Sequence, residues 1–295
     1  MYRIGLDLGG TKIEAAVLDE SGHILFRKRI PTGQEQGYES ILNRLWQIYQ
    51  DAASSIHQAP HTLGIGTPGA FSQKTGLLKN SNTVCLNQRL SLRELCERLR
   101  HPVAVENDAN CFAMAEAVSG AGAGQEWVFG VILGTGCGGG IVHQGRLIRG
   151  RQSIAGEWGH MVLDPSGPSC YCGARGCVET FISGGGLEKA YRTRFGTPKV
   201  LQDIVSSYRN RDPEAASFMN DFFERFGQAL ANVINVLDPD IVVLGGGVSN
   251  IDEIYTRGIE EVRKRVFSDE MTTPIVRHAL GDSAGVIGAA LIGIG

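Results

Sequence analysis

One histidine and three cysteines are spaced as the ligands of a structural metal site. His160 is followed by Cys170, Cys172 and Cys177, in the pattern H-x₉-C-x-C-x₄-C. Three thiolates and one imidazole form a closed tetrahedral zinc site, which leaves no position for a catalytic water. The pattern predicts a Zn²⁺ ion that holds a loop, with a disulfide or buried free thiols as alternatives. The remaining cysteines are expected to be packing residues: Cys85, Cys96, Cys111 and Cys137.

A carboxylate lies at each end of this cysteine-rich segment. Glu157 precedes His160 by three positions, and Glu179 follows Cys177 by two. Either could be an ordinary surface charge. Carboxylates fixed to both ends of a pinned loop are, however, suited to accept hydrogen bonds from sugar hydroxyls. We therefore take both as candidate sugar ligands.

A second acidic segment, Glu106-Asn107-Asp108-Ala109-Asn110, stands between an expected strand and an expected helix. A carboxylate within hydrogen-bond reach of a hydroxyl is what phosphoryl transfer to that hydroxyl requires. Asp108 is thus a candidate general base, and Asn107 can both donate to and accept from sugar hydroxyls. The alternative is that Asn107 or Asp108 only caps the helix.

Three glycine-rich turns follow apolar strands and are candidates for binding a nucleotide. Backbone without Cβ lets N–H groups approach an anion closely, and a carboxylate beside them can hold hydrated Mg²⁺. None is a P-loop or a dinucleotide fingerprint, and the first could be an ordinary hairpin. The candidate cofactor residues are Asp7, Gly9, Gly10, Thr11, Lys12, Gly134, Thr135, Gly136, Cys137, Gly138, Gly245, Gly246 and Gly247.

Hydrophobic periodicity predicts the elements that position these residues. Strands are expected at 3–31 (three, antiparallel), 63–66, 103–105, 128–133, 141–142, 147–148 and 241–244, and helices at 38–56, 91–100, 108–120, 184–195, 214–237, about 252–266 and 282–293. The second half partly repeats the first, which predicts a duplicated α/β fold with a cleft between two domains. The expected domains are 1–118, rejoined by a C-terminal helix at 282–295, and 119–281, which is larger and carries the metal loop.

Composition excludes several classes of function. The chain has 295 residues, a net charge of −3 and 40 glycines. Dispersed basic residues disfavour nucleic acid as a partner. Charges at Arg3, Asp7 and Lys12 interrupt any secretory signal, and the uncharged stretch 127–145 is too rich in glycine for a membrane helix. We expect a cytoplasmic protein without a membrane partner.

Together these motifs resemble the ROK family (repressor, open reading frame, kinase) of sugar kinases, within the actin/hexokinase-like, ribonuclease H-like superfamily. The resemblance runs from Ile4 through the C-terminal helix. Its marks are the Asp7–Lys12 turn, Gly66-Thr67-Pro68-Gly69, the segment 106–110, Leu133–Gly140, Gly156-Glu157-Trp158-Gly159-His160, and the complete pattern C-x-C-G-x-x-G-C-x-E from Cys170 to Glu179.

This resemblance implies an ATP-dependent hexose kinase that uses Mg²⁺ and a structural Zn²⁺ and is often a homodimer. It implies that Asp108 is the catalytic base and that the turns at 9–12 and 134–138 bind phosphates, with 245–247 beside the nucleoside. His160 would place one ring nitrogen on zinc and direct the other at the sugar. The implied sugar-binding residues are Gly66, Pro68, Asn107, Asp108, Glu157, His160 and Glu179.

Within the family, the segments 79–87 and 179–184 most resemble bacterial fructokinases of the manno(fructo)kinase type, so fructose is the expected substrate. That type often has a longer insert than the nine residues between His160 and Cys170 here. A glucokinase, an N-acetylglucosamine kinase and a non-catalytic sugar-sensing regulator are the alternatives. The phosphate turn at Asp7 leaves no room before it for a helix-turn-helix, which favours the kinase.

Overall fold

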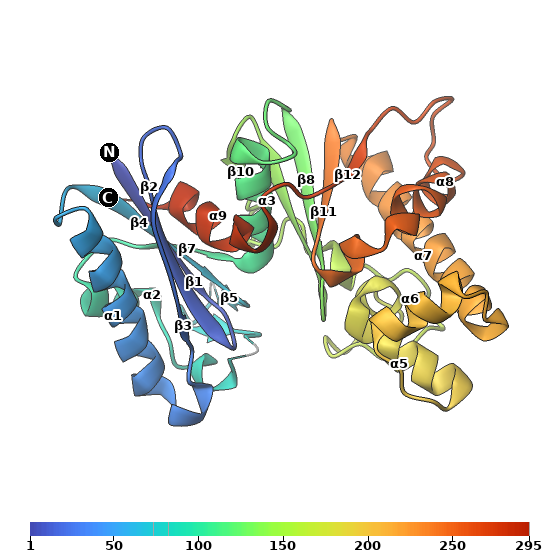
Figure 1. The fold of residues 1–295 in the computed structure, drawn as a ribbon, viewed down its shortest axis with the longest axis horizontal. Helices are drawn as coiled ribbons and strands as arrows, with labels where there is room; N and C mark the ends of the chain where they lie inside the picture. Colours follow the sequence, from blue (N-terminus) through green and yellow to red (C-terminus); the bar gives the residue numbers. More distant parts are fainter. Residues whose placement is uncertain (73, 82, 295) are drawn as a thin grey trace. The chain divides into compact units, whose positions relative to one another are not determined.

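The computed structural model describes residues 1–72, 74–81 and 83–294. These residues form two compact units, shown in Figure 1. Unit 1 comprises Met1–Gly120 and Leu280–Gly295, and unit 2 comprises Ala121–Ala279. The chain thus leaves unit 1 after Gly120 and returns after Ala279, where the sequence predicted crossings after residues 118 and 281.

Unit 1 is built on a five-stranded sheet with the order β3-β2-β1-β4-β7. The three consecutive strands are antiparallel, and β4 and β7 continue the sheet in parallel. Its strands are β1 (Tyr2–Leu8), β2 (Lys12–Leu18), β3 (Ile24–Pro31), β4 (His61–Thr67) and β7 (Ala104–Asn107). Its helices are α1 (Tyr38–Ser55), α2 (Leu92–Leu99), α3 (Asp108–Ser119) and α9 (Ala284–Ile292).

The two faces of this sheet are covered differently. Ile4 and Leu6 are fully buried in one core with the apolar face of α1. Gly5, between them, therefore faces the other side, where α9 lies. A Cβ on Gly5 would stand 2.2 Å from the Val286 carbonyl oxygen, and one on the paired Gly64 only 2.0 Å from that of Ala289. The C-terminal helix can lie this close to β1 and β4 only because both positions are glycine.

Short elements complete unit 1. A two-stranded hairpin and three 3-10 turns that the sequence did not predict lie between the main elements. They are β5 (Ala70–Phe71), β6 (Leu78–Lys79), η1 (Gln34–Gln36), η2 (Val84–Leu86) and η6 (Gly281–Ser283). Asn82, in the segment that resembles fructokinases, lies outside the described residues.

Unit 2 repeats the topology of unit 1 with the order β10-β9-β8-β11-β12. Again three consecutive strands are antiparallel and two more are parallel, which confirms the prediction of a duplicated α/β fold. The strands are β8 (Trp127–Leu133), β9 (Cys137–His143), β10 (Arg146–Leu147), β11 (Ile241–Gly245) and β12 (Ile275–Arg277).

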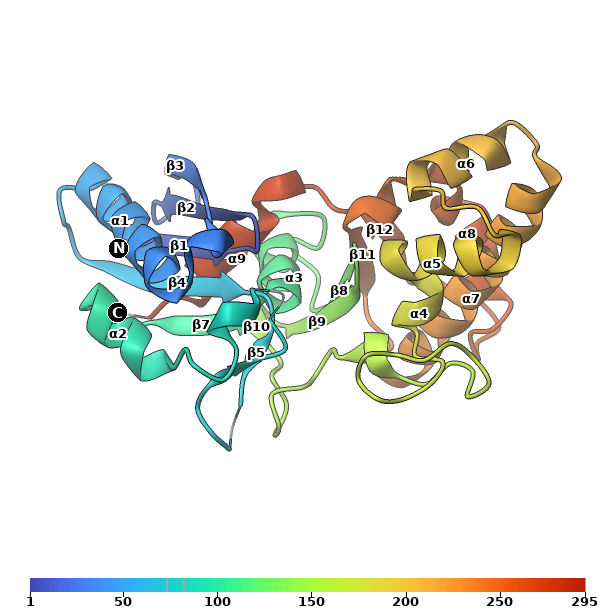
Figure 2. The same ribbon diagram turned by 90° about the horizontal axis from the view of Figure 1, so that it is seen from below.

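The helices of unit 2 pack through one large apolar core. Both views show α5–α8 together on one side of the sheet (Figures 1 and 2). The helices are α4 (Glu179–Ile182), α5 (Gly184–Phe195), α6 (Leu201–Arg209), α7 (Pro213–Leu237) and α8 (Arg257–Arg263), with 3-10 turns η3 (Trp158–His160), η4 (Gly247–Asn250) and η5 (Asp252–Tyr255). Among the described residues, no helix is both long and apolar enough to cross a membrane.

Some predicted boundaries were wrong. The helix expected at 252–266 is the 3-10 turn η5 followed by the shorter α8, and α6 and β12 were not predicted. The second glycine turn is also shorter than expected, because β9 begins at Cys137 and pairs Gly138, Gly139 and Gly140 with β8. Glycine within a strand marks a close approach, and a Cβ on Gly139 would stand 2.8 Å from the Trp158 ring.

Candidate active site

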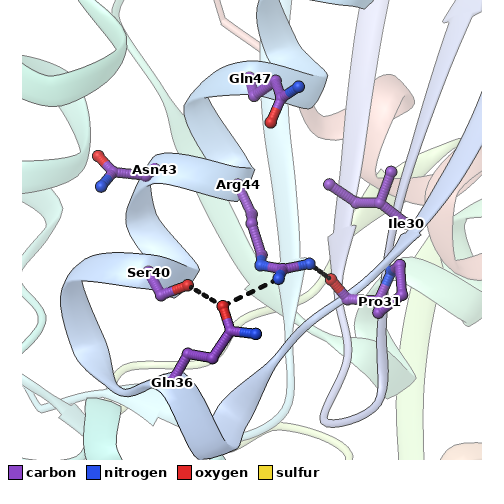
Figure 3. Close-up of a pocket in the computed structure, with 7 residues that line it drawn as sticks. All are labelled: Ile30, Pro31, Gln36, Ser40, Asn43, Arg44 and Gln47. Carbon is purple, nitrogen blue, oxygen red and sulfur yellow. Dashed lines mark hydrogen bonds between the residues drawn. The ribbon is translucent and has the colours of Figure 1, made fainter.

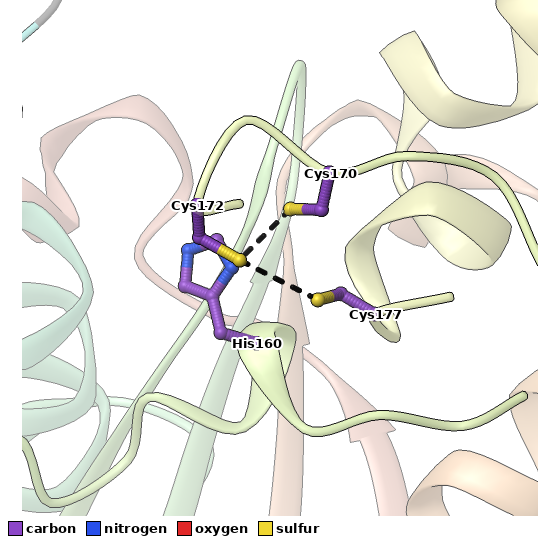
Figure 4. A group of neighbouring side chains, drawn as sticks. All are labelled: His160, Cys170, Cys172 and Cys177. Atoms are coloured by element: carbon purple, nitrogen blue, oxygen red, sulfur yellow. Dashed lines mark hydrogen bonds between the residues drawn. The ribbon is translucent and has the colours of Figure 1, made fainter. Parts of the chain in front are cut away.

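The predicted metal ligands converge in unit 2, as Figure 4 shows. One ligand atom from each of His160, Cys170, Cys172 and Cys177 lies within 4.8 Å of all the others. The His160 Nδ1 and Cys170 Sγ atoms are 3.6 Å apart, as are the Cys172 and Cys177 Sγ atoms. Ligands at the usual Zn–S and Zn–N lengths of a tetrahedral site stand about 3.6–3.8 Å apart. The donor set and its spacing therefore fit a structural zinc ion.

The backbone around the ligands is constrained by glycine. Gly176 has a φ of +65°, and a Cβ there would lie 1.5 Å from the Asp164 carbonyl oxygen. That approach is accompanied by hydrogen bonds from the Leu163 and Gly176 backbones across the loop. A side chain at position 176 would force the loop apart, which explains a glycine directly before Cys177.

Glu179 connects the metal loop to the second glycine turn. It begins α4 two residues after Cys177, and its carboxylate accepts a hydrogen bond of 2.9 Å from the Cys137 backbone N–H. A Cβ on Gly136 would stand only 2.7 Å from the same carboxylate oxygen. A predicted sugar ligand therefore lies directly against a predicted phosphate turn, a contact that the sequence did not reveal.

The second and third glycine clusters also lie together. The strands β8 and β11 are parallel neighbours, with Gly245 opposite Ile132, so Gly134 and Gly246 follow the same edge of the sheet. The Gly134 and Thr135 carbonyls accept hydrogen bonds from the backbone N–H groups of Gly184 and Gly185 at the start of α5. The carboxyl edge of a parallel sheet is the usual place for a nucleotide.

Tyr171, for which the sequence predicted no role, is hydrogen-bonded to the second ring nitrogen of His160. Its hydroxyl lies 3.0 Å from His160 Nε2, and the two rings meet edge to face with centroids 5.1 Å apart. The resemblance predicted that this nitrogen faces the sugar; in the structure its partner is the phenol. The sequence did contain one signal for this contact, the aromatic residue between two metal ligands in Cys170-Tyr171-Cys172.

Two carboxylates of unit 2 act electrostatically on this phenol. Desolvation, followed by the charge of Glu179 and with a smaller contribution from Glu157, raises the pKa of Tyr171 to about 12. The hydroxyl is therefore protonated at neutral pH. Glu157 directly precedes η3, three residues before His160. Glu157, His160, Tyr171 and Glu179 thus form one neighbourhood in unit 2.

In unit 1, Asn107 and Asp108 stand where β7 passes into α3. Asn107 caps the helix, because its Oδ1 accepts a 2.7 Å hydrogen bond from the Asn110 N–H. Its amide nitrogen is still a donor. Asp108 is the first residue of α3, and its Oδ1 lies 2.9 Å from the Ala109 N–H. The carboxylate therefore stands at the positive end of the helix dipole.

Asp7 lies beside this junction, near the end of β1. It is opposite Gly66 in the sheet, where a Cβ would be 3.6 Å from Asp7 Oδ1. Desolvation, then the charges of Asp108 and Glu14, raises the pKa of Asp7 to about 6, while Lys12 and Arg29 oppose the shift. The structure therefore brings Asp7, Gly66 and Asp108 together, and Pro68 follows directly after β4.

The first glycine turn joins β1 to β2. The Gly9 N–H donates to the Lys12 carbonyl at 3.0 Å, and the Thr32 hydroxyl donates to the Gly9 carbonyl at 2.7 Å. The Gln34 side chain also donates to the Gly10 carbonyl. The turn is thus held by hydrogen bonds to the Gly9, Gly10 and Lys12 carbonyls, one of which comes from the Gly9 N–H of the turn itself. Thr11 is exposed within it.

The raised pKa of Asp7 predicts a pH-dependent stability. A carboxyl whose folded pKa exceeds its unfolded value stabilises the fold below pH 4, and this contribution is lost as the pH rises through 6. The shift of about two units corresponds to about 3 kcal/mol. Asp7→Asn should therefore raise the free energy of unfolding by up to about 3 kcal/mol at pH 7.5 and leave it unchanged at pH 4.

Urea unfolding of the ligand-free protein at both pH values checks this. The matched control is Asp51→Asn, which removes an exposed carboxylate that pairs with Lys28. A stabilisation of Asp7→Asn that is equal at both pH values would contradict the assignment.

A polar depression is lined by the end of β3, by η1 and by α1 (Figure 3). The Arg44 guanidinium donates to the Pro31 carbonyl and to Gln36 Oε1, each at 3.0 Å. The Ser40 hydroxyl donates to the same Gln36 oxygen at 3.0 Å. These polar groups already form hydrogen bonds with one another, so we assign no ligand to the depression.

Residues 3–294 match the sequence profile of the ROK family. The chain belongs to the ROK family. It is 36% identical over 303 residues to an N-acetyl-D-glucosamine kinase of Histophilus somni, covering 98% of this chain and 97% of the relative. An N-acetylgalactosamine kinase of a Shewanella species is also 36% identical, covering 99% and 96%.

Solved structures of ROK proteins share this fold. A ROK hexokinase from Thermus thermophilus matches with a TM-score of 0.89 and 35% identity over 99% of this chain and 98% of that one. A ROK glucokinase from Streptomyces griseus, solved with glucose and AMPPNP, matches with a TM-score of 0.78 and 29% identity over 99% of both chains. This ROK protein is therefore an enzyme of the sugar-kinase class, with the actin/hexokinase-like fold.

The comparisons do not support the expected preference for fructose. The curated relatives at 34–36% identity over nearly the full length of this ROK protein are named for N-acetylated hexosamines. The short segments that resembled fructokinases cover only a small part of the chain. The alternative of an N-acetylglucosamine kinase is better supported than the fructokinase interpretation.

Proposed function

We propose that this chain is an ATP-dependent kinase of N-acetylated hexosamines, with N-acetylglucosamine as its preferred substrate. The observation that carries the proposal is full-length similarity to several kinases of that name. The placement of Asp108 at the start of α3 supports catalysis rather than binding alone. A non-catalytic sugar-binding module would have no need of both a base and two phosphate turns.

The proposed roles follow from the resemblance to ROK sugar kinases. From unit 1, Asp108 accepts the proton of the attacked hydroxyl, and Asn107 hydrogen-bonds to the sugar. From unit 2, Glu157 and Glu179 accept hydrogen bonds from sugar hydroxyls, and His160 donates one. Gly66 and Pro68 form part of the wall of the sugar site.

The glycine turns are assigned to the nucleotide. The turns at 9–12 and 134–138 are assigned to the phosphates, and 245–247 to the nucleoside. Within the two turns the backbone N–H groups of Gly10, Thr11, Thr135 and Gly136 would be the donors, because those of Gly9, Gly134 and Cys137 already donate within the protein. Asp7 would hold hydrated Mg²⁺, which neutralises charge on the transferred phosphoryl group when it is bound. The zinc ion would only order the loop that carries Glu157, His160 and Glu179. A homodimer remains a prediction from the resemblance.

A coupled ADP-release assay across four sugars tests the proposal. We expect the highest kcat/KM with N-acetylglucosamine, followed by glucose and mannose, with fructose the weakest. A site that hydrogen-bonds the acetamido group leaves buried polar groups unpaired when another sugar binds, which costs about 1–3 kcal/mol. The assay therefore predicts a preference of about 5- to 150-fold for N-acetylglucosamine. A higher kcat/KM with fructose would restore the fructokinase interpretation, and no turnover with any sugar would contradict kinase activity.

A further inference from the structure

The nitrogen of His160 that faces away from the cysteines is already paired. Nδ1 lies on the side of Cys170, so a metal ion held by the four ligands takes the lone pair of that nitrogen. Nε2 then carries the proton and is a donor. Its partner is the Tyr171 oxygen, 3.0 Å away.

The phenol that receives this hydrogen bond is weakly held. Tyr171 is 74% exposed, on the tip between Cys170 and Cys172. In the described part of the chain, His160 supplies both its side-chain hydrogen bond and its ring contact. Moving the phenol away therefore costs one hydrogen bond and uncovers little apolar surface.

Under the proposed function, on which this inference rests, a sugar hydroxyl needs the same N–H. One N–H cannot give a full hydrogen bond to two oxygens that both require its axis. The two carboxylates proposed to bind the sugar stand on the same segment as His160: Glu157 directly precedes η3, and Glu179 begins α4 two residues after Cys177. The phenol oxygen thus stands where a hydroxyl of the sugar would be received.

We propose that Tyr171 sets the sugar affinity of this enzyme: its hydroxyl takes the place of a sugar hydroxyl on His160 in the free enzyme and is exchanged for it when the sugar binds. The exchange breaks one N–H···O hydrogen bond and forms another, with no net transfer of a proton. Sugar binding then includes the cost of releasing the phenol. Tyr171 acts through His160 and is a positioning residue, not a catalytic one.

Tyr171→Phe tests this directly, because it removes the competing oxygen and keeps the ring. Titration of the zinc-loaded full chain with the sugar that the wild type phosphorylates best should give a Kd about 2- to 10-fold lower than that of the wild type. The sugar KM should fall with it, while zinc content, the KM for ATP and the unfolding midpoint stay unchanged. An unchanged or higher Kd would overturn the proposal.

Two further variants separate competition from support. Tyr171→Leu removes the ring as well; competition predicts a lower Kd, whereas a role in bracing His160 predicts a higher Kd and weaker zinc binding. Tyr208→Phe is the matched control, since it removes from α6 a phenol oxygen that accepts from Arg257 of α8, and its sugar Kd should equal that of the wild type. Turnover by the wild type tests the proposed function separately. If the wild type phosphorylates a sugar but Tyr171→Phe leaves the sugar Kd unchanged, only the exchange is refuted. If the wild type phosphorylates no sugar, both proposals are refuted.

Discussion

Asp108→Asn is expected to lower kcat by about 10²–10⁴-fold, because an amide cannot accept the proton of the attacked hydroxyl. The fold should survive, since asparagine keeps the oxygen that accepts from the Ala109 N–H, and Asn107 still caps the helix. Steady-state kinetics with the preferred sugar measure the loss, and direct titration should show sugar binding close to that of the wild type.

The control for this variant is again Asp51→Asn, at an exposed ion pair on α1. It removes the same charge without touching the proposed site, so its kcat should be unchanged. A fall of less than tenfold for Asp108→Asn would show that Asp108 only stabilises the first turn of α3.

Cys177→Ser is expected to release the zinc ion and, with it, nearly all activity. Cys177 is fully buried, its Sγ lies 3.6 Å from that of Cys172, and serine is a poor zinc ligand. Removing a group that hydrogen-bonds to a metal ligand already weakens metal binding by about 10–100-fold, so removing the ligand itself should weaken metal binding further. Glu179, two residues away, would no longer be held against the Cys137 N–H.

Elemental analysis and kcat/KM measured on the same preparation check this expectation. The wild type should contain one zinc ion per chain. Cys96→Ser, which changes a cysteine of α2 outside the cluster, should keep both the zinc and the activity. A fully active Cys177→Ser, or a wild type without zinc, would refute the structural metal site.

The local patterns of the sequence predicted much of the fold. Alternating apolar residues marked β1 to β3, and the position of α5 was predicted as the structure has it. The spacing of His160 and the three cysteines predicted that they meet, because the chemistry of the donor set limits the geometry. Glycine was the least reliable guide to secondary structure, since Gly138–Gly140 were predicted to lie in a turn but belong to β9 and pair with β8.

The contacts between distant segments could not be predicted in this way. Glu179 reaches Cys137 across 42 positions because α4 packs against the start of β9, which depends on the whole of unit 2. The raised pKa of Asp7 similarly depends on neighbours from β2 and α3 that only the folded sheet supplies. The hydrogen bond between His160 and Tyr171 was not predicted because a single side-chain hydrogen bond produces no hydrophobic periodicity in the sequence.

The return of the chain to unit 1 has a consequence for folding during synthesis. The glycine faces of β1 and β4 are made to receive α9, and that helix leaves the ribosome only after all of unit 2. At usual translation rates the delay is on the order of ten seconds. Throughout it, the nascent first sheet lacks the helix for one of its faces, whereas unit 2 is continuous in sequence. The second unit should therefore mature before the first, opposite to the order in which they are made.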